Sequence, residues 1–172
     1  MGTARVVAAG RDLERLERAR SLGADATVEL GDGVGAEELR DRFAEAADGR
    51  LDVALDPLWG APARAAIDAL TGDGVYVSFG QAASPVAELS GIPLRNRRVT
   101  LAGHSGAWAT PQERQAALAR AHELATGGSP LAIDTEEVGL DEIGSAWDRL
   151  ARSAGRRLVV RLRAIPASPT RS

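Results

Sequence analysis

Short apolar runs alternate with longer amphipathic segments along most of the 172-residue chain. Apolar runs bounded by Gly, Pro or Asp predict buried strands, and apolar residues recurring every three to four positions predict helices. The strands are expected at Arg5–Ala9, Ala26–Leu30, Leu51–Leu55, Val75–Phe79, Val99–Gly103, Ile133–Val138 and Leu158–Leu162. The helices are expected at Asp12–Leu22, Ala36–Ala47, Ala61–Leu70, Gln112–Ala125 and Asp141–Ala151. Between them, Thr71–Gly74 predicts a turn and Gln81–Leu94 predicts a loop.

This alternation predicts an α/β protein with a mainly parallel sheet and helices on both of its faces. In such sheets, ligands bind beside the carboxyl ends of the strands. We therefore expect four loop tips to face one crevice: Gly10-Arg11, Asp56-Pro57, Phe79-Gly80-Gln81 and Gly103-His104-Ser105.

Composition narrows the class of protein. Hydrophobic residues make up 44% and charged residues 26%, which is typical of a globular domain. The chain has no cysteine and two histidines, so we expect no disulfide, thiol chemistry or zinc. The net charge of −3 and the lack of a long apolar run give no reason to expect nucleic acid or a membrane as partner. We expect a cytoplasmic protein.

Five segments, in this order and spacing, resemble the medium-chain dehydrogenase/reductase family, and most of all its zinc-free, quinone oxidoreductase-like branch. They are ARVVAAGRDLERLERARSLGAD, LDVALDPLWG, GDGVYVSFG, PLRNRRVTLAG and LDEIGSAWDRLARSAGRRLVVRL, which together span residues 3–163. The resemblance implies a Rossmann-like, doubly wound domain that binds NAD or NADP beside a separate catalytic domain.

The resemblance begins at the family's second strand, because only four residues precede Arg5. We therefore expect a Rossmann-like fold that lacks the first strand and the glycine-rich loop. Residues 1–164 would form this truncated dinucleotide-binding domain with its closing helix and strand, and 165–172 would form a disordered tail. The segment GDGVG at Gly31–Gly35 does not have the spacing of a phosphate-binding GxGxxG loop.

The resemblance also indicates which nucleotide is bound. Members specific for NAD carry an acidic residue after the second strand, where this chain has Gly10 followed by Arg11, with Arg15 one turn further on. A guanidinium group can hold a 2′-phosphate, which would favour NADP over NAD. The alternative is that Arg11 is an ordinary solvated side chain, since all 21 basic residues of the chain are arginine.

The resemblance also implies that two turns and one strand end lie near the nicotinamide half of the coenzyme. These cofactor-binding candidates are Asp56, Pro57, Phe79, Gly80, Gln81 and Gly103. For Asp56-Pro57 the alternative is a rigid turn that only ends the strand. His104 and Ser105 are neighbours, but the sequence indicates no third member of a catalytic triad. We expect the three tryptophans to be packing residues. No catalytic residue can be assigned.

Two functions remain open. The first is the coenzyme-binding portion of an NADP-dependent oxidoreductase acting on a small carbonyl or enone, inactive as the isolated chain. The second is a non-catalytic nucleotide-binding or interaction module on the same scaffold. A methyltransferase is less consistent, since no acidic residue follows Arg5–Ala9. We also expect a homodimer through the apolar edge strand Val99–Gly103.

Overall fold

The computed structural model describes residues 5–127, 135–151 and 157–162. The chain divides into two compact units, residues 1–116 and 117–172, which are described separately below. The strands are β1 (Val7–Gly10), β2 (Ala26–Glu29), β3 (Leu51–Asp56), β4 (Leu70–Ser78), β5 (Thr100–Gly103), β6 (Thr135–Gly139) and β7 (Arg157–Arg161). The α-helices are α1 (Leu13–Ser21), α2 (Ala36–Ala46), α3 (Gly60–Ala69), α4 (Gly91–Asn96), α5 (Pro111–Thr126) and α6 (Ile143–Ala151). Short 3₁₀ helices cover Gly106–Trp108 and Leu140–Glu142.

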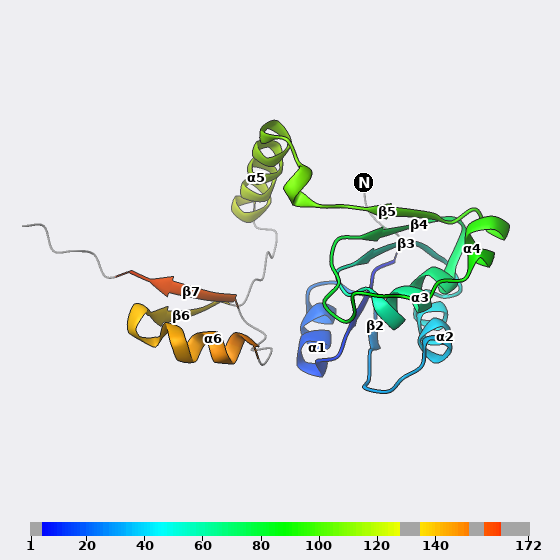
Figure 1. The fold of residues 1–172 in the computed structure, drawn as a ribbon, viewed down its shortest axis with the longest axis horizontal. Coiled ribbons are helices and arrows are strands. Elements are labelled where there is room, and N and C mark those ends of the chain that lie inside the picture. Colours follow the sequence, from blue (N-terminus) through cyan, green and yellow to red (C-terminus); the bar gives the residue numbers. More distant parts are fainter. Residues whose placement is uncertain (1–4, 128–134, 152–156, 163–172) are drawn as a thin grey trace, which may run out of the picture. The chain divides into compact units, whose positions relative to one another are not determined.

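The α/β architecture predicted from the sequence is confirmed, and every strand pair in the described residues is parallel (Figure 1). The predicted third and fourth strands are neighbours in one sheet, with Val53 opposite Val75 and Leu55 opposite Val77. The predicted tail at 165–172 lies outside the described residues. Among the described helices, none combines the length and the apolar character that crossing a membrane requires.

The strands of the first unit form two sheets, where we expected a single one. The first sheet pairs β1 with β2, and the second has the order β3-β4-β5. In a doubly wound sheet of order 3-2-1-4-5-6, the strand at position 1 would join these two groups. The two groups are instead connected through helices, as the core shows.

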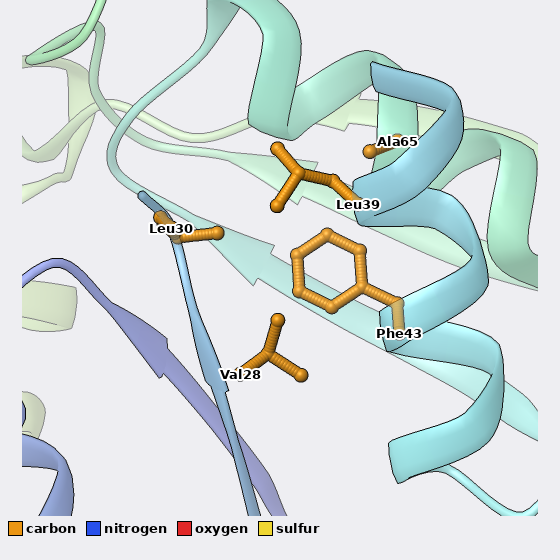
Figure 2. Close-up of a cluster of buried hydrophobic side chains, with 5 residues drawn as sticks. All are labelled: Val28, Leu30, Leu39, Phe43 and Ala65. Carbon is orange, nitrogen blue, oxygen red and sulfur yellow. The ribbon is translucent and has the colours of Figure 1, made fainter. Parts of the chain in front are cut away.

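One hydrophobic core connects the two sheets through α2 and α3. Phe43 and Leu39 of α2 point toward Val28 and Leu30 on the β2 side, and Ala65 of α3 completes the cluster (Figure 2). A second cluster packs α3 against the other sheet, with members Ala63, Ile67, Leu70, Tyr76 and Val99.

Helices cover both faces of the β1–β2 sheet. On one face, Arg20 of α1 donates hydrogen bonds of 2.7 and 3.1 Å to the hydroxyl of Thr27. On the other face, Val28 packs against α2. Asp12 starts α1 as expected, because its carboxylate accepts the N–H of Arg15 at 3.2 Å.

The helix α3 packs against one face of the second sheet. Tyr76 points to the α3 side, and the alternation of a strand places Val53 and Leu55 on the opposite side. These two side chains are 57% and 69% exposed, which is unusual for apolar residues in a three-stranded parallel sheet.

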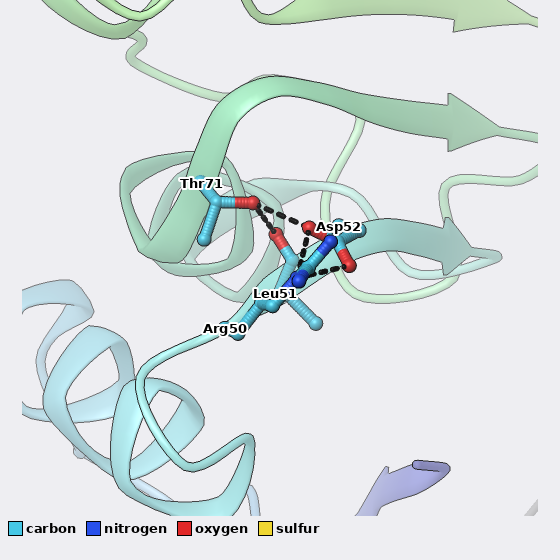
Figure 3. A network of polar contacts seen from close by, with 4 residues as sticks. All are labelled: Arg50, Leu51, Asp52 and Thr71. Atoms are coloured by element: carbon cyan, nitrogen blue, oxygen red, sulfur yellow. Dashed lines mark hydrogen bonds and ion pairs between the residues drawn. The ribbon is translucent and has the colours of Figure 1, made fainter. Parts of the chain in front are cut away.

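The predicted turn at Thr71–Gly74 is wrong, because this segment lies inside β4. A register shift between Leu51 and Val53 accommodates the extra residues of β4. The Thr71 hydroxyl donates to the Leu51 carbonyl at 3.0 Å and to the Asp52 carboxylate at 2.8 Å, which ties the segment to β3 (Figure 3). Arg50 donates to the same carboxylate at 2.9 Å.

The predicted loop at 81–94 is also corrected, because α4 begins within it. The Ser90 hydroxyl accepts the N–H of Ile92 at 3.2 Å and caps the helix. Pro93 is tolerated because it lies in the first turn, where backbone N–H groups have no partner within the helix.

The second unit contains a β-α-β arrangement. β6 and β7 pair in parallel, with Val138 opposite Val160, and α6 connects them. Val138 and Ala146 are its buried apolar residues among those described. The helix α5 has no buried side chain, and its residue His122 is exposed.

Candidate functional site

A cavity of about 250 Å³ lies at the carboxyl ends of β4 and β5. Its position is the one that parallel sheets use for ligands. The residues that line it are Trp59, Tyr76, Ser78, Gly80, Gln81, Leu101, Ala102 and Gly103. Two of the four loop tips predicted from the sequence therefore contribute to one cavity.

Three predicted residues line this cavity: Gly80, Gln81 and Gly103. A Cβ atom added to Gly103 would meet no atom within 4 Å, so this strand end faces open space. Gly80 is different, since an added Cβ would lie 2.5 Å from the carbonyl oxygen of Pro57. The absence of a side chain at Gly80 is therefore needed first for packing against the neighbouring turn.

Asp56 and Pro57 form the turn beside the cavity and do not line it. Asp56 is 7% exposed, and its carboxylate accepts the N–H groups of Leu58 at 2.7 Å and Trp59 at 2.9 Å. It also accepts the hydroxyl of Tyr76. These contacts support the second interpretation of Asp56-Pro57, in which the turn shapes the strand end.

Phe79 lies outside the cavity lining and is half exposed. Its N–H donates to the Asp56 carbonyl at 3.0 Å, which extends the β3–β4 ladder by one bond. His104 continues the β4–β5 ladder in the same way, donating from its N–H to the Ser78 carbonyl at 2.8 Å. Ser105 caps the following 3₁₀ helix by accepting the N–H of Ala107 at 3.3 Å.

The predicted 2′-phosphate site lies on the β1–β2 sheet, away from the cavity lining. Gly10 ends β1, Arg11 follows it with an exposed side chain, and Arg15 lies in the first turn of α1. Arg15 forms an ion pair of 3.6 Å with Asp12. Among the described residues, no ion pair or hydrogen bond occupies the guanidinium of Arg11, so it can accept an anionic ligand.

Sequence reasoning did not identify Trp59, Tyr76 and Ser78 as cavity residues, and assigned all three tryptophans to packing. Trp59 is half buried, and its ring centroid lies 6.1 Å from that of Tyr76 at an interplanar angle of 53°. Trp108 and Trp147 are 89% and 70% exposed, which contradicts the packing interpretation for these two. The sequence signal that could have identified Trp59 as a cavity residue is the dipeptide Trp59-Gly60, which comes shortly after the Asp56-Pro57 turn.

The cavity has little chemistry of its own for acid–base catalysis. Burial raises the pKa of the Tyr76 hydroxyl, and its hydrogen bond to the negatively charged Asp56 raises that pKa further. Tyr76 thus stays protonated and engaged with Asp56. Ser78 adds one hydroxyl, which lies 3.5 Å from the Gly80 carbonyl oxygen. The lining is suited to holding a ring rather than to moving a proton.

A second cavity, of about 510 Å³, lies beside the outer edge of β2. Its arginines are engaged within the protein. Arg42 donates to the Glu29 carbonyl at 2.9 Å and to Glu38 at 2.6 Å, and Arg20 donates to Thr27. This cavity therefore presents fewer free polar groups than its size suggests.

The donor atoms do not fit a metal ion. In the described part of the chain, no three His, Asp or Glu side chains gather as a bound cation would require. The sequence adds no cysteine.

A family model described as zinc-binding dehydrogenase matches residues 1–139. No curated protein matches the chain. Similar solved structures include an alcohol dehydrogenase zinc-binding domain protein from Burkholderia ambifaria, with a TM-score of 0.75 and 23% identity over 94% of this chain and 42% of that one.

Two further structures share the fold. The mycobacterial protein Rv1454c, complexed with NADPH, has a TM-score of 0.75 and 20% identity over 91% of this chain and 48% of its own. The quinone oxidoreductase of Pseudomonas syringae pv. tomato DC3000 has a TM-score of 0.73 and 21% identity over 91% and 48%. The chain thus spans less than half the length of these proteins.

Proposed function

The chain belongs to the zinc-binding dehydrogenase family, and on this premise we propose that it is the coenzyme-binding portion of an NADP-dependent oxidoreductase. The observation that carries the proposal is the cavity at the carboxyl ends of β4 and β5, in the position where parallel sheets bind nucleotides. In the part of the chain that the structure describes, no set of donor side chains fits the zinc in the family's name, so no step is assigned to a metal.

In this proposal, NADP binds with its nicotinamide half in the cavity and its 2′-phosphate at Arg11 and Arg15. Two features support the choice of NADP. Gly10 offers no carboxylate to a ribose hydroxyl, and Arg11 is an exposed cationic residue directly after the end of β1. The similar mycobacterial structure contains NADPH. When bound, the nicotinamide would supply the hydride chemistry.

The substrate class follows only from the similarity to the quinone oxidoreductase and alcohol dehydrogenase structures. We propose a small carbonyl compound, quinone or enone as the acceptor in the full-length context. The protein would act in the cytoplasm, which is consistent with a sequence without cysteine.

Calorimetry on the 172-residue chain tests the coenzyme proposal. NADPH should bind more tightly than NADH, and Arg11→Ala should remove most of that difference. Arg18→Ala is the matched control, because Arg18 is an exposed arginine in the last turn of α1, the helix that follows Arg11. Equal affinity for the two coenzymes, or equal effects of the two substitutions, would contradict the 2′-phosphate site.

The alternative is a non-catalytic nucleotide-binding module. It is favoured by one observation, that the cavity offers no free acid or base, since Tyr76 is hydrogen-bonded to Asp56. Oxidation of NADPH by the 172-residue chain, with quinones and enones as acceptors, tests whether the isolated chain is an enzyme. Both functions predict no turnover above the uncatalysed rate, and clear turnover would contradict both.

We also propose a two-fold dimer through the outer edge of β5. This strand is the edge of its sheet, and Thr100, Leu101 and Gly103 are exposed. Val99, which we expected in the same edge, is buried in the second cluster and would not take part. A monomer by sedimentation at high micromolar concentration would contradict this dimer.

A further inference from the structure

Trp59 has a backbone conformation that bulky residues rarely adopt. Its φ is +61° and its ψ is −168°, in a region that is favourable mainly for glycine. Glycine at this position would remove the strain. The chain instead places its largest type of side chain here and keeps glycine for Gly60, whose φ is +71°.

The buried carboxylate of Asp56 holds this conformation in place. Its two oxygens accept the N–H groups of Leu58 and Trp59, and the hydroxyl of Tyr76 secures the same carboxylate from β4. The turn is therefore fixed from two strands. A strained residue that persists because its surroundings fix it is characteristic of functional sites.

The strained turn places the Trp59 ring at the wall of the cavity. The ring lies beside that of Tyr76, and Leu101 and Gly103 of β5 contribute other parts of the lining. A cavity of about 250 Å³ is smaller than the roughly 300–1,000 Å³ of sites that enclose whole ligands. It suits one ring of a larger molecule.

We propose that Trp59 is a specificity-determining residue, whose indole packs against the flat face of the nicotinamide ring. This inference rests on the proposed function and deepens it. The strain at φ +61° is retained because the side chain contacts the ligand. Asp56 acts as a positioning residue, since it reaches the ligand only through Trp59.

Fluorescence can observe Trp59 alone. The other two tryptophans are exposed and lie outside the cavity, so Trp108→Phe and Trp147→Phe leave Trp59 as the only indole. In this background, NADP⁺ and nicotinamide mononucleotide should quench the emission. Adenosine 2′,5′-bisphosphate, which lacks the nicotinamide ring, should bind without quenching it.

Three substitutions test the contact itself. Trp59→Phe keeps an aromatic face, Trp59→Leu keeps only apolar bulk, and Trp59→Gly removes both the side chain and the strain. Trp59→Leu and Trp59→Gly should weaken NADP⁺ binding by about tenfold, the size of a lost aromatic stacking contact. Trp59→Phe should retain most of the affinity, and all three should bind adenosine 2′,5′-bisphosphate like the wild type.

The outcomes separate this inference from the proposed function. If the wild type binds NADP⁺ but Trp59→Leu binds it equally well, Trp59 does not contact the ring and the inference is wrong. If the wild type binds neither NADP⁺ nor the bisphosphate, the coenzyme function fails and the inference fails with it. Retained bisphosphate binding shows that a variant is folded, so a loss of NADP⁺ affinity then supports the contact.

Discussion

The hydroxyl of Tyr76 donates a hydrogen bond to the carboxylate of Asp56, and this contact joins the middle of β4 to the end of β3. Tyr76 is the only tyrosine of the chain and is 1% exposed. Its burial raises the pKa of the phenol, and the hydrogen bond and the charge of Asp56 raise it further.

Alkaline titration should therefore unfold the protein as the phenol ionises. The unfolded tyrosine has a pKa of about 10, so this contribution to stability is complete below pH ~10 and is lost as the pH rises above it. Ultraviolet difference spectroscopy and circular dichroism should show the phenolate and the unfolding together. A phenolate that forms near pH ~10 with unchanged circular dichroism would contradict this prediction.

Tyr76→Phe should destabilise the protein at neutral pH by about 1–3 kcal/mol, because Asp56 loses one hydrogen bond in a buried position. The ring itself and its packing against Trp59 are kept. Urea unfolding measures this loss of stability. The variant should also not show the loss of stability at high pH that ionisation of the Tyr76 phenol causes in the wild type. Unchanged stability would indicate that water replaces the hydroxyl.

Gly80→Ala should destabilise the fold, whereas Gly103→Ala should leave its stability nearly unchanged. The added methyl group at Gly80 would lie 2.5 Å from the Pro57 carbonyl oxygen, and such overpacking costs about 1–3 kcal/mol. At Gly103 the methyl group meets nothing within 4 Å, and the change should stay within about 0.5 kcal/mol. Equal urea midpoints for the two variants would show that the turn moves away from Gly80.

Thr71→Val should raise the pKa of Asp52 toward its ordinary value. The hydrogen bond from Thr71 is the largest cause that lowers this pKa, and Arg50 adds to it. Since a lowered carboxyl pKa stabilises the fold above its unfolded value of about 4, that stabilisation disappears as the pH falls. NMR titration of the Asp52 carboxyl carbon should show the upward shift, and Arg50→Ala should shift it less.

Phe43→Ala should be the most damaging of these substitutions, costing about 3–5 kcal/mol. Phe43 lies at the centre of the cluster that α2 and α3 form with β2, so its loss leaves a cavity between the β1–β2 sheet and these two helices (Figure 2). Leu118→Ala on α5, where the leucine is exposed, is the control and should change stability by less than about 0.5 kcal/mol. Comparable losses in the two variants would contradict the assigned core.

The strands and most helices could be predicted because their signals are local. An apolar run such as Leu51–Leu55 identifies a strand by itself, and Asp12 identifies the start of α1. The segment at Thr71–Gly74 has the local signals of a turn. Its place in β4 depends on contacts with distant residues, such as the 2.8 Å bond from the Asp73 N–H to the Arg97 carbonyl.

The candidate site could be predicted only in part, for the same reason. The cavity residues Gly80 and Gly103 follow strands that are visible in the sequence. The conformation of Trp59 depends on which atoms the Asp56 carboxylate accepts, and no pattern of residue types specifies this. Asp56 was therefore a cofactor-binding candidate in the sequence, while in the structure its carboxylate belongs to the internal hydrogen-bond network.

The separation of β1–β2 from β3–β4–β5 has a consequence for amide hydrogen exchange. In the described residues, no backbone hydrogen bond joins the two sheets, and their connection runs through side chains of α2 and α3. Opening the β1–β2 pair therefore breaks no bond of the other ladder. The two sheets can therefore open to solvent as separate cooperative units. Amides of β1 and β2 should then exchange independently of those of β4, which remain protected while the β1–β2 pair is open.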